Sequence, residues 1–330
     1  MSGKRFRKVF FIAEIASSHN GSKKNLQKIV NELIKTDVSA IKLQIFNYKQ
    51  LVHKSYKYYK ILKRISLPNS FLEKIIQIIL KANKEVILEP FDADSFDFCK
   101  KFNKEISIKV SSSDNNNKKL IKSSLSVFKK VFISISGMNL VDVKKILKEN
   151  SKNKKIILTY GFQSFPTKIE DLRLNFIYNL KKIRNKICYA DHTSANSLID
   201  NILTIQQAIK NGSMFIEKHV TLDKNKGYPD SDSSLEISEF NDLVNFFNKK
   251  ISNKNTISKN ERKYSKNMTR NAVLKKKVIK DKVFNINDVL FLRTGEKGIP
   301  FNEIKRFKNK IYNNNYKDND ILKKKFFYKK

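Results

Sequence analysis

Apolar residues in the first 220 positions form two kinds of pattern that alternate along the chain. Short continuous runs are typical of strands buried on both faces, and longer stretches with an apolar residue every three or four positions are typical of amphipathic helices. Eight short runs are present, with helical stretches between them. These predicted strands are 9–16, 40–46, 85–91, 106–112, 131–136, 155–161, 187–192 and 214–220.

The helical stretches each carry a single apolar face. After the first strand, positions 26, 29, 30, 33 and 34 are apolar, and Ser22 can cap the amino end of this helix. Ser70–Leu80 and Ser197–Ile209 have the same periodicity. Eight strand-then-helix repeats predict an α/β fold, the (β/α)8 TIM barrel. An open doubly wound sheet is the alternative, but no glycine-rich phosphate turn follows the first strand.

The pattern changes after residue 248, which predicts a barrel over 1–248 and a second domain beyond it. Residues 249–266 are polar and charged with almost no apolar period, and are interpreted as a linker. Residues 267–330 are predicted to form a small β-rich domain from the segments Thr269–Ile279, Val283–Leu292 and Gly295–Ile304. The remainder, Lys305–Lys330, gives no clear pattern.

The net charge is +37, from 68 Lys and Arg against 31 Asp and Glu. Such a charge can indicate a partner that is a nucleic acid or another polyanion. However, Lys, Asn and Ile are enriched together along the whole chain, the basic residues do not cluster on one element, and no nucleic-acid-binding motif is found. Nucleotide bias is therefore the preferred explanation, although the charge can still attract anionic substrates.

The sequence favours a cytoplasmic protein. Glu14 interrupts the first apolar run too early for a secretory signal, and no run is long enough to cross a membrane. Cys99 and Cys188 have neither metal-binding nor redox spacing and are predicted to be buried free thiols.

Ionisable side chains recur at the carboxyl ends of the predicted strands, where the catalytic loops of a barrel converge. Two lysines, two glutamates and two histidines lie there, on five strands that are otherwise apolar. They are Glu14, Lys42, Lys109, His192, Glu217 and His219. Each alone could be structural, but charged residues inside apolar strands are costly unless paired or functional. As a set they predict an active site.

The residue types indicate the chemistry. Lys42, Lys109 and nearby serines suit a ligand with a phosphate and a carboxylate. His192 and His219 can offer two neutral imidazoles to one divalent metal, and the alternative is that they are only hydrogen-bonded in the barrel mouth. The sequence alone goes no further than activation of a carbonyl beside an anion pocket.

At these residues the chain resembles the sialic acid synthase family, which makes N-acetylneuraminic, legionaminic and pseudaminic acids. The resemblance covers almost the full length. It rests on FIAEIASSHNG at 11–21, AIKLQIF at 40–46, PFDADSFD at 90–97, IKVSSSD at 108–114, SGM at 136–138, FPT at 165–167, ADHT at 190–193, IEKHVT at 216–221 and residues 222–235. The segment FLRTGEKGI at 291–299 is similar to the antifreeze-like (SAF) domain that ends these enzymes.

The resemblance implies condensation of phosphoenolpyruvate with the open-chain aldehyde of an N-acyl hexosamine such as N-acetylmannosamine, with release of phosphate. It also implies a domain-swapped homodimer and a divalent metal, Mn²⁺ with Mg²⁺ or Co²⁺ as alternatives, bound by His192 and His219. Glu14 and Glu217 match the acidic groups beside the metal and the aldehyde. The residues matched to substrate binding are Lys42, Gln44, Lys109, Ser112, Ser136, Gln163, Asp230 and Arg293, the last delivered by the partner subunit.

Several positions depart from the family pattern, all at the phosphate and sugar contacts. Glu89 stands where a threonine is usual, Ile135 and Ser136 precede the Gly-Met pair, Tyr160 replaces the usual histidine, and Gln163 replaces an Asn or Ser. The identity of the sugar is therefore left open. Two other functions also remain open: a non-catalytic polyanion binder, and a related enzyme that condenses phosphoenolpyruvate with a different aldose.

Overall fold

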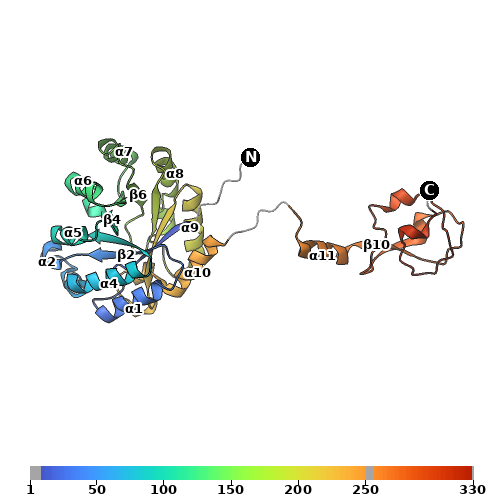
Figure 1. The fold of residues 1–330 in the computed structure, drawn as a ribbon, viewed down its shortest axis with the longest axis horizontal. Coiled ribbons are helices and arrows are strands. Elements are labelled where there is room, and N and C mark those ends of the chain that lie inside the picture. Colours follow the sequence, from blue (N-terminus) through green and yellow to red (C-terminus); the bar gives the residue numbers. More distant parts are fainter. Residues whose placement is uncertain (1–8, 250–255, 329–330) are drawn as a thin grey trace. The chain divides into compact units, whose positions relative to one another are not determined.

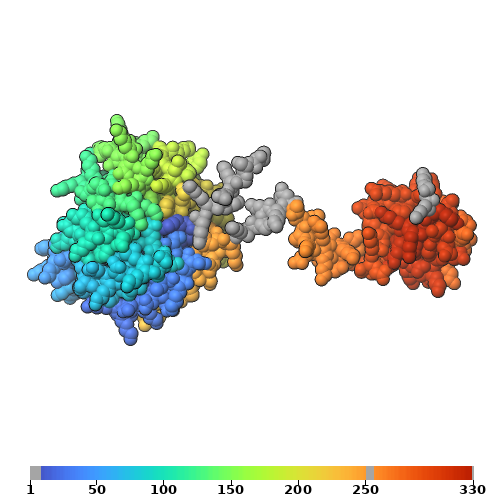
Figure 2. Space-filling model, in the orientation of Figure 1, coloured from blue at the N-terminus to red at the C-terminus, as the bar shows by residue number. Residues whose placement is uncertain are grey.

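A computed structural model describes residues 9–249 and 256–328. The chain divides into two compact units, residues 1–249 and 250–330, each with its own hydrophobic core (Figures 1 and 2). Figure 2 shows the side chains of each unit packed closely together, the first coloured blue to orange and the second orange to red.

The first unit is a closed barrel of eight parallel strands, which confirms the predicted (β/α)8 fold. Consecutive strands pair with one another, and β1 pairs with β8 to close the barrel. The strands are β1 (Phe10–Glu14), β2 (Ala40–Ile45), β3 (Glu85–Pro90), β4 (Ser107–Val110), β5 (Val131–Ser134), β6 (Ile156–Tyr160), β7 (Ile187–Asp191) and β8 (Phe215–Thr221). A two-residue strand, β9 (Leu235–Glu236), pairs in parallel with the end of β8. All eight predicted strands are present, and most are shorter than their apolar runs.

Helices surround the barrel, as Figure 1 shows. They are α1 (Lys23–Leu33), α2 (Tyr48–Leu51), α3 (Tyr59–Ile65), α4 (Asn69–Lys81), α5 (Ala93–Lys100), α6 (Lys118–Val127), α7 (Leu140–Glu149), α8 (Leu174–Ile183), α9 (Leu198–Lys210) and α10 (Ile237–Asn248). The predicted N-cap Ser22 is confirmed, because its hydroxyl accepts a hydrogen bond from the Asn25 amide. None of the helices in the described parts of the chain is long and apolar enough to cross a membrane.

Short 3-10 helices occupy several loops. They are η1 (Ser112–Asp114), η2 (Ile169–Asp171), η3 (Lys224–Lys226), η4 (Ser231–Ser233), η5 (Ile286–Asp288), η6 (Ile304–Phe307) and η7 (Lys324–Phe326).

The interior of the barrel is filled by an apolar layer near the amino ends of the strands. It contains Ile12, Ala40, Ile87, Phe132, Ile157 and Cys188, with Phe10 and Phe215 packed against them. Because side chains alternate along a strand, the residues two positions further on point into the same interior. On four strands those next residues are Glu14, Lys42, Glu89 and Glu217. The apolar layer therefore forms a water-excluding floor beneath a layer of charges.

The second unit consists of α11 (Lys259–Met268), an antiparallel pair of strands and irregular segments. The strands are β10 (Arg270–Leu274) and β11 (Val289–Arg293). The tail Lys305–Lys330, part of the predicted small domain, supplies Tyr312, Leu322, Phe326 and Phe327 to the core. Helix α11 overlaps the predicted linker 249–266, because a capping box at Ser258 and Glu261 starts a helix there, and none of its residues is buried. Residues 250–255 of that segment lie outside the described residues.

Candidate active site

Five ionisable side chains form a buried layer across the barrel, and we refer to Glu14, Lys42, Glu89, Lys109 and Glu217 as the charged layer. The Lys42 Nζ lies 2.5 Å from Glu14, 2.5 Å from Glu89 and 3.1 Å from Glu217. The Lys109 Nζ lies 2.7 Å from Glu217 and 3.7 Å from Glu89. Every one of these residues is at least nine-tenths buried.

The strand register explains why these residues meet. Glu14 pairs with Lys42 on β2, so both lie at the same level of the barrel. Glu89 lies two positions beyond Ile87, which pairs with both Lys42 and Ser107, and Lys109 lies two positions beyond Ser107. Residues two apart face the same side of a strand, so five different strands direct one charge each to a common centre.

Pairing and burial oppose each other in the charged layer: burial lowers the pKa of Lys42 despite its carboxylate neighbours, whereas pairing prevails at Glu217 and Lys109. Burial alone raises the pKa of Glu217, but the ammonium groups of Lys109 and Lys42 outweigh it and hold that pKa far below its usual range. Burial alone lowers the pKa of Lys109, yet Glu217 and Glu89 outweigh it and the net shift is upward. Glu217 and Lys109 therefore carry their charges at neutral pH.

The two histidines lie next to each other at the mouth side of the charged layer. His192, which follows β7, and His219 on β8 have ring centroids 5.3 Å apart in an edge-to-face arrangement. The ring of Phe165 lies against both, at 4.5 and 5.5 Å. Burial lowers the pKa of His192 to about 4, and burial also lowers the pKa of His219 well below its usual value. Both imidazoles are therefore neutral at pH 7.

The histidine pair fits a divalent metal. The Nδ1 of His192 lies 2.6 Å from the Phe162 carbonyl. Because a carbonyl oxygen only accepts, the ring proton is on Nδ1 and the lone pair of Nε2 is free. The Nδ1 of His219 is buried without a hydrogen-bond partner among the described residues. Those residues contain no group of three or more His, Cys, Asp or Glu arranged around a metal position.

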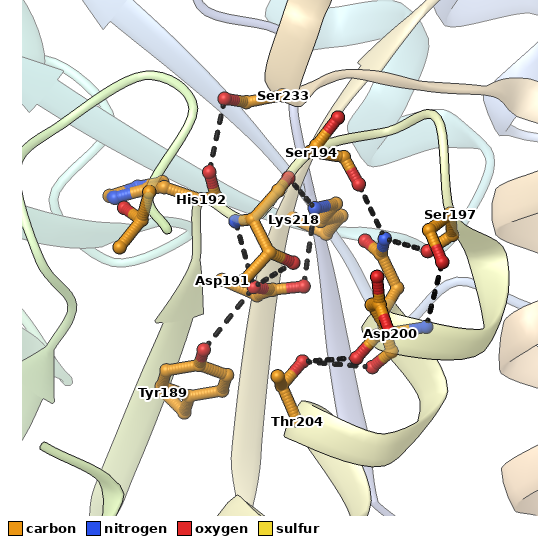
Figure 3. Close-up of polar contacts among 12 residues, drawn as sticks. Tyr189, Asp191, His192, Ser194, Ser197, Asp200, Thr204, Lys218 and Ser233 are labelled. Carbon is orange, nitrogen blue, oxygen red and sulfur yellow. Dashed lines mark hydrogen bonds and ion pairs between the residues drawn. The ribbon is translucent and has the colours of Figure 1, made fainter. Parts of the chain in front are cut away.

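A buried polar network holds the main chain around His192 (Figure 3). The His192 carbonyl accepts hydrogen bonds from the Ser233 hydroxyl at 3.1 Å and from the Thr167 amide at 2.8 Å. Asp191 and Lys218, the neighbours of the two histidines, form an ion pair at 3.2 Å and are fully buried. Since alternate residues face opposite sides of a strand, this ion pair lies behind the strands, away from the charged layer.

Of the other predicted site residues, Gln163 and Ser136 are joined by a hydrogen bond. The amide of Gln163 donates to the Ser136 hydroxyl at 3.1 Å, and that hydroxyl donates to the Gly161 carbonyl at 2.5 Å. Gln44 lies on β2 two residues beyond Lys42, and Ser112 begins η1 after β4, so both are at the mouth.

Asp230, at the start of η4, has a left-handed backbone with φ of 69°. Burial raises its pKa, and hydrogen bonds from Ser17 oppose that shift. Arg293 lies at the end of β11 in the second unit and is therefore not a residue of the barrel.

The buried histidines predict a loss of stability on acidification. Burial lowers the pKa of His19 to about 4, and its Nδ1 accepts a hydrogen bond from the Gly21 amide. In the unfolded chain the His19 imidazole is protonated below about pH 6.5, whereas in the folded chain it stays neutral down to about pH 4. The free energy of unfolding therefore falls as the pH is lowered from 6.5 to 4, by about 3 kcal/mol for this residue.

Urea unfolding at pH 7 and pH 4, with chelator present, checks this expectation. His19→Asn keeps an acceptor for Gly21 but cannot titrate, so the variant should lose about 3 kcal/mol less than the wild type over that interval. Equal losses in the two proteins would contradict the assignment.

Comparison with known proteins identifies the family. The NeuB family profile matches residues 29–259, more than two thirds of the chain. The chain belongs to the NeuB family. This confirms the resemblance to sialic acid synthases.

Individual relatives agree with the family assignment. An N,N'-diacetyllegionaminic acid synthase of Campylobacter jejuni is 27% identical, over 96% of this chain and 99% of that protein. A pseudaminic acid synthase of the same species is 27% identical over 72% of each chain. The crystal structure of an N-acetylneuraminic acid synthetase from Leptospira borgpetersenii, at 21% identity, superimposes with a TM-score of 0.66 over 79% of this chain and 93% of that one. This NeuB-family protein is thus an enzyme of the synthase type.

Glu89 is the member of the charged layer that was not among the predicted site residues. The sequence marked it only as a departure from the family pattern at the phosphate and sugar contacts. The alternation along β3, with Ile87 in the apolar floor and Glu89 one step above it, is the signal that could have found it.

Proposed function

We propose that this NeuB-family enzyme condenses phosphoenolpyruvate with the open-chain aldehyde of an N-acyl hexosamine such as N-acetylmannosamine. The methylene carbon of phosphoenolpyruvate forms a bond to the aldehyde carbon, water adds at the carbon that carries the phosphate ester, and inorganic phosphate leaves. The observation that carries the proposal is the charged layer, in which two buried lysines lie below a pair of neutral histidines.

Lys42 and Lys109 are the proposed ligands of the phosphate and carboxylate of phosphoenolpyruvate. They are the two cations of the charged layer, and cations in a water-excluded interior interact strongly with an anion. Ser112, Ser136 and Gln163 are hydroxyl and amide groups at the same mouth and are proposed to complete the anion site. The hydrogen bond from Gln163 to Ser136 supports a common role for these two.

His192 and His219 are proposed to hold a divalent metal, Mn²⁺ with Mg²⁺ or Co²⁺ as alternatives. When bound, such an ion polarises a carbonyl oxygen as a Lewis acid. The chain's own contribution is to keep both imidazoles neutral and to fix the ring of His192 through Phe162. Two histidines do not decide which of these metals binds.

Glu14 and Glu217 are the proposed acidic groups beside the reacting aldehyde. Glu217 stays ionised because both lysines face it, so it is suited to orient Lys42 and Lys109 and to stabilise positive charge rather than to donate a proton. Burial raises the pKa of Asp230, although hydrogen bonds from Ser17 oppose that shift. Gln44 and Asp230 are the proposed contacts to the sugar.

A phosphate-release assay tests the proposed reaction. The enzyme is incubated with phosphoenolpyruvate, Mn²⁺ and either N-acetylmannosamine or diacetamido-hexoses of the legionaminic and pseudaminic types. We expect release that requires both the sugar and the metal, with one sugar strongly preferred. Release with none of these sugars, but with an unsubstituted aldose, would favour the related condensing enzyme instead.

The second unit is proposed to be an antifreeze-like domain that acts in a homodimer. By the family resemblance, Arg293 of one chain would complete the sugar site of the other. A mixture of Arg293→Ala and His219→Ala chains tests this directly. Random exchange makes half of the dimers mixed, and each mixed dimer has one intact site, so about a quarter of wild-type activity should return.

Each variant alone serves as the control in this experiment, and subunit exchange is verified with differently tagged chains. No recovery in a mixture that has exchanged would mean that Arg293 serves its own chain or none.

A further inference from the structure

The charged layer contains one more negative than positive group. Among the described residues, the ion pairs of Glu14, Glu89 and Glu217 are with Lys42 and Lys109. Loss of either Glu14 or Glu89 would balance the count, and of these two carboxylates Glu89 is the one that lies near both lysines. Glu89 is therefore the additional charge that bears on both cations, in a place where an unbalanced charge is costly.

Glu89 contacts the same two cations that a substrate anion would use. Its carboxylate lies 2.5 Å from the Nζ of Lys42 and 3.7 Å from that of Lys109, and the residue is only 5% exposed. A second anion that approached these lysines would meet this carboxylate at close range, with little water to screen the repulsion. Lys42 and Lys109 can bind a phosphate ester tightly only if Glu89 moves away from them.

We propose that Glu89 competes, inside the protein, with the anionic substrate for Lys42 and Lys109 and so sets the affinity of the site for phosphate esters. The inference rests on the proposed function, in which these lysines bind phosphoenolpyruvate. Because of this competition, the enzyme binds phosphate esters more weakly than it would if Lys42 and Lys109 had no Glu89 beside them. Binding of the ester requires the Glu89 carboxylate to be displaced.

Titration calorimetry of the full chain with inorganic phosphate and with phosphoenolpyruvate tests the proposal. Glu89→Gln keeps the size of the side chain and removes its charge, so both ligands should bind at least about tenfold more tightly than to the wild type. Glu89→Asp keeps the charge in the layer and should leave the affinity near that of the wild type. Should the glutamine variant fail to fold, Glu89→Thr is the second neutral variant for the same measurement.

Glu85→Gln is the matched control. Glu85 lies on the same strand at the floor end of the barrel, where it pairs with Lys130 at 2.5 Å. Among the described residues it forms no ion pair with either lysine of the charged layer, so its neutralisation should leave phosphate affinity unchanged. An equal gain in Glu85→Gln would overturn the proposal, since it would show a general charge effect. Unchanged or weaker binding in folded Glu89→Gln would overturn it as well.

Turnover measurements separate this inference from the proposed function. In an active enzyme, Glu89→Gln should lower the KM for phosphoenolpyruvate more than it changes kcat. If no sugar supports turnover but phosphate still binds more tightly to Glu89→Gln, the role of Glu89 stands and the proposed reaction fails. If turnover is found and phosphate affinity does not respond, the role of Glu89 fails and the reaction stands.

Discussion

Alanine in place of either His192 or His219 is expected to lower kcat at least about a thousandfold. A metal that polarises a carbonyl contributes several kcal/mol of transition-state stabilisation. Removal of one of the two proposed protein ligands should release the metal ion, and this stabilisation is then lost. Because the two ligands act as one unit, the double variant should be no less active than either single variant. Steady-state kinetics at saturating Mn²⁺, with circular dichroism to verify folding, provides the measurement.

The stability of these variants separates a metal ligand from a structural histidine. Both side chains are about 95% buried and packed against Phe165, so truncation is expected to cost about 1–2 kcal/mol. His53→Ala, at an exposed histidine whose ring contacts Ser55, should keep near-normal activity. Chelator-sensitive activity close to wild type in either His192→Ala or His219→Ala would rule out the metal assignment.

Lys42→Met is expected to produce the largest loss of stability, together with loss of activity. Lys42 is the cation that contacts all three carboxylates of the charged layer. Its removal leaves Glu14 and Glu89 without their short ion pairs in a water-excluded interior. Removal of one partner from a buried ion pair typically costs about 3–5 kcal/mol, because the remaining charge is uncompensated. Urea unfolding at pH 7 measures the change.

The same substitution on the far side of the barrel provides the control. Lys130 pairs with Glu85 at 2.5 Å, but its side chain is 31% exposed. Water can solvate both groups when the pair is broken, so Lys130→Met should cost about 1 kcal/mol or less. Similar losses in the two variants would mean that the charged layer is solvated and not a buried network.

The barrel could be predicted from sequence because its signals are local. Eight apolar runs identify eight strands, and the N-cap Ser22 fixes the start of α1. Helix α11 was not predicted, because its signal is a capping box at Ser258 in a segment without an apolar face. The sequence also could not predict which residues of the tail enter the core of the second unit, because residues such as Tyr312 pack there through contacts with residues distant in sequence.

The members of the site could be predicted only as far as residue type and strand position allow. Lys42, Lys109 and Glu217 were found as charges in apolar strands, and the structure brings them together. The sequence could not show that Glu89 joins them, because this depends on the register between β2, β3 and β4. It also could not show that Asp191 and Lys218 pair behind the strands.

The proposed reaction of this NeuB-family enzyme is the formation of a carbon–carbon bond between phosphoenolpyruvate and an N-acyl hexosamine. Mass spectrometry of the product made from phosphoenolpyruvate labelled with ¹³C at all three carbons tests it most directly. We predict one product with the mass of the sugar plus labelled pyruvate, formed in equal amount with phosphate and absent from His219→Ala. Phosphate and free labelled pyruvate, with the sugar unchanged, would contradict the account.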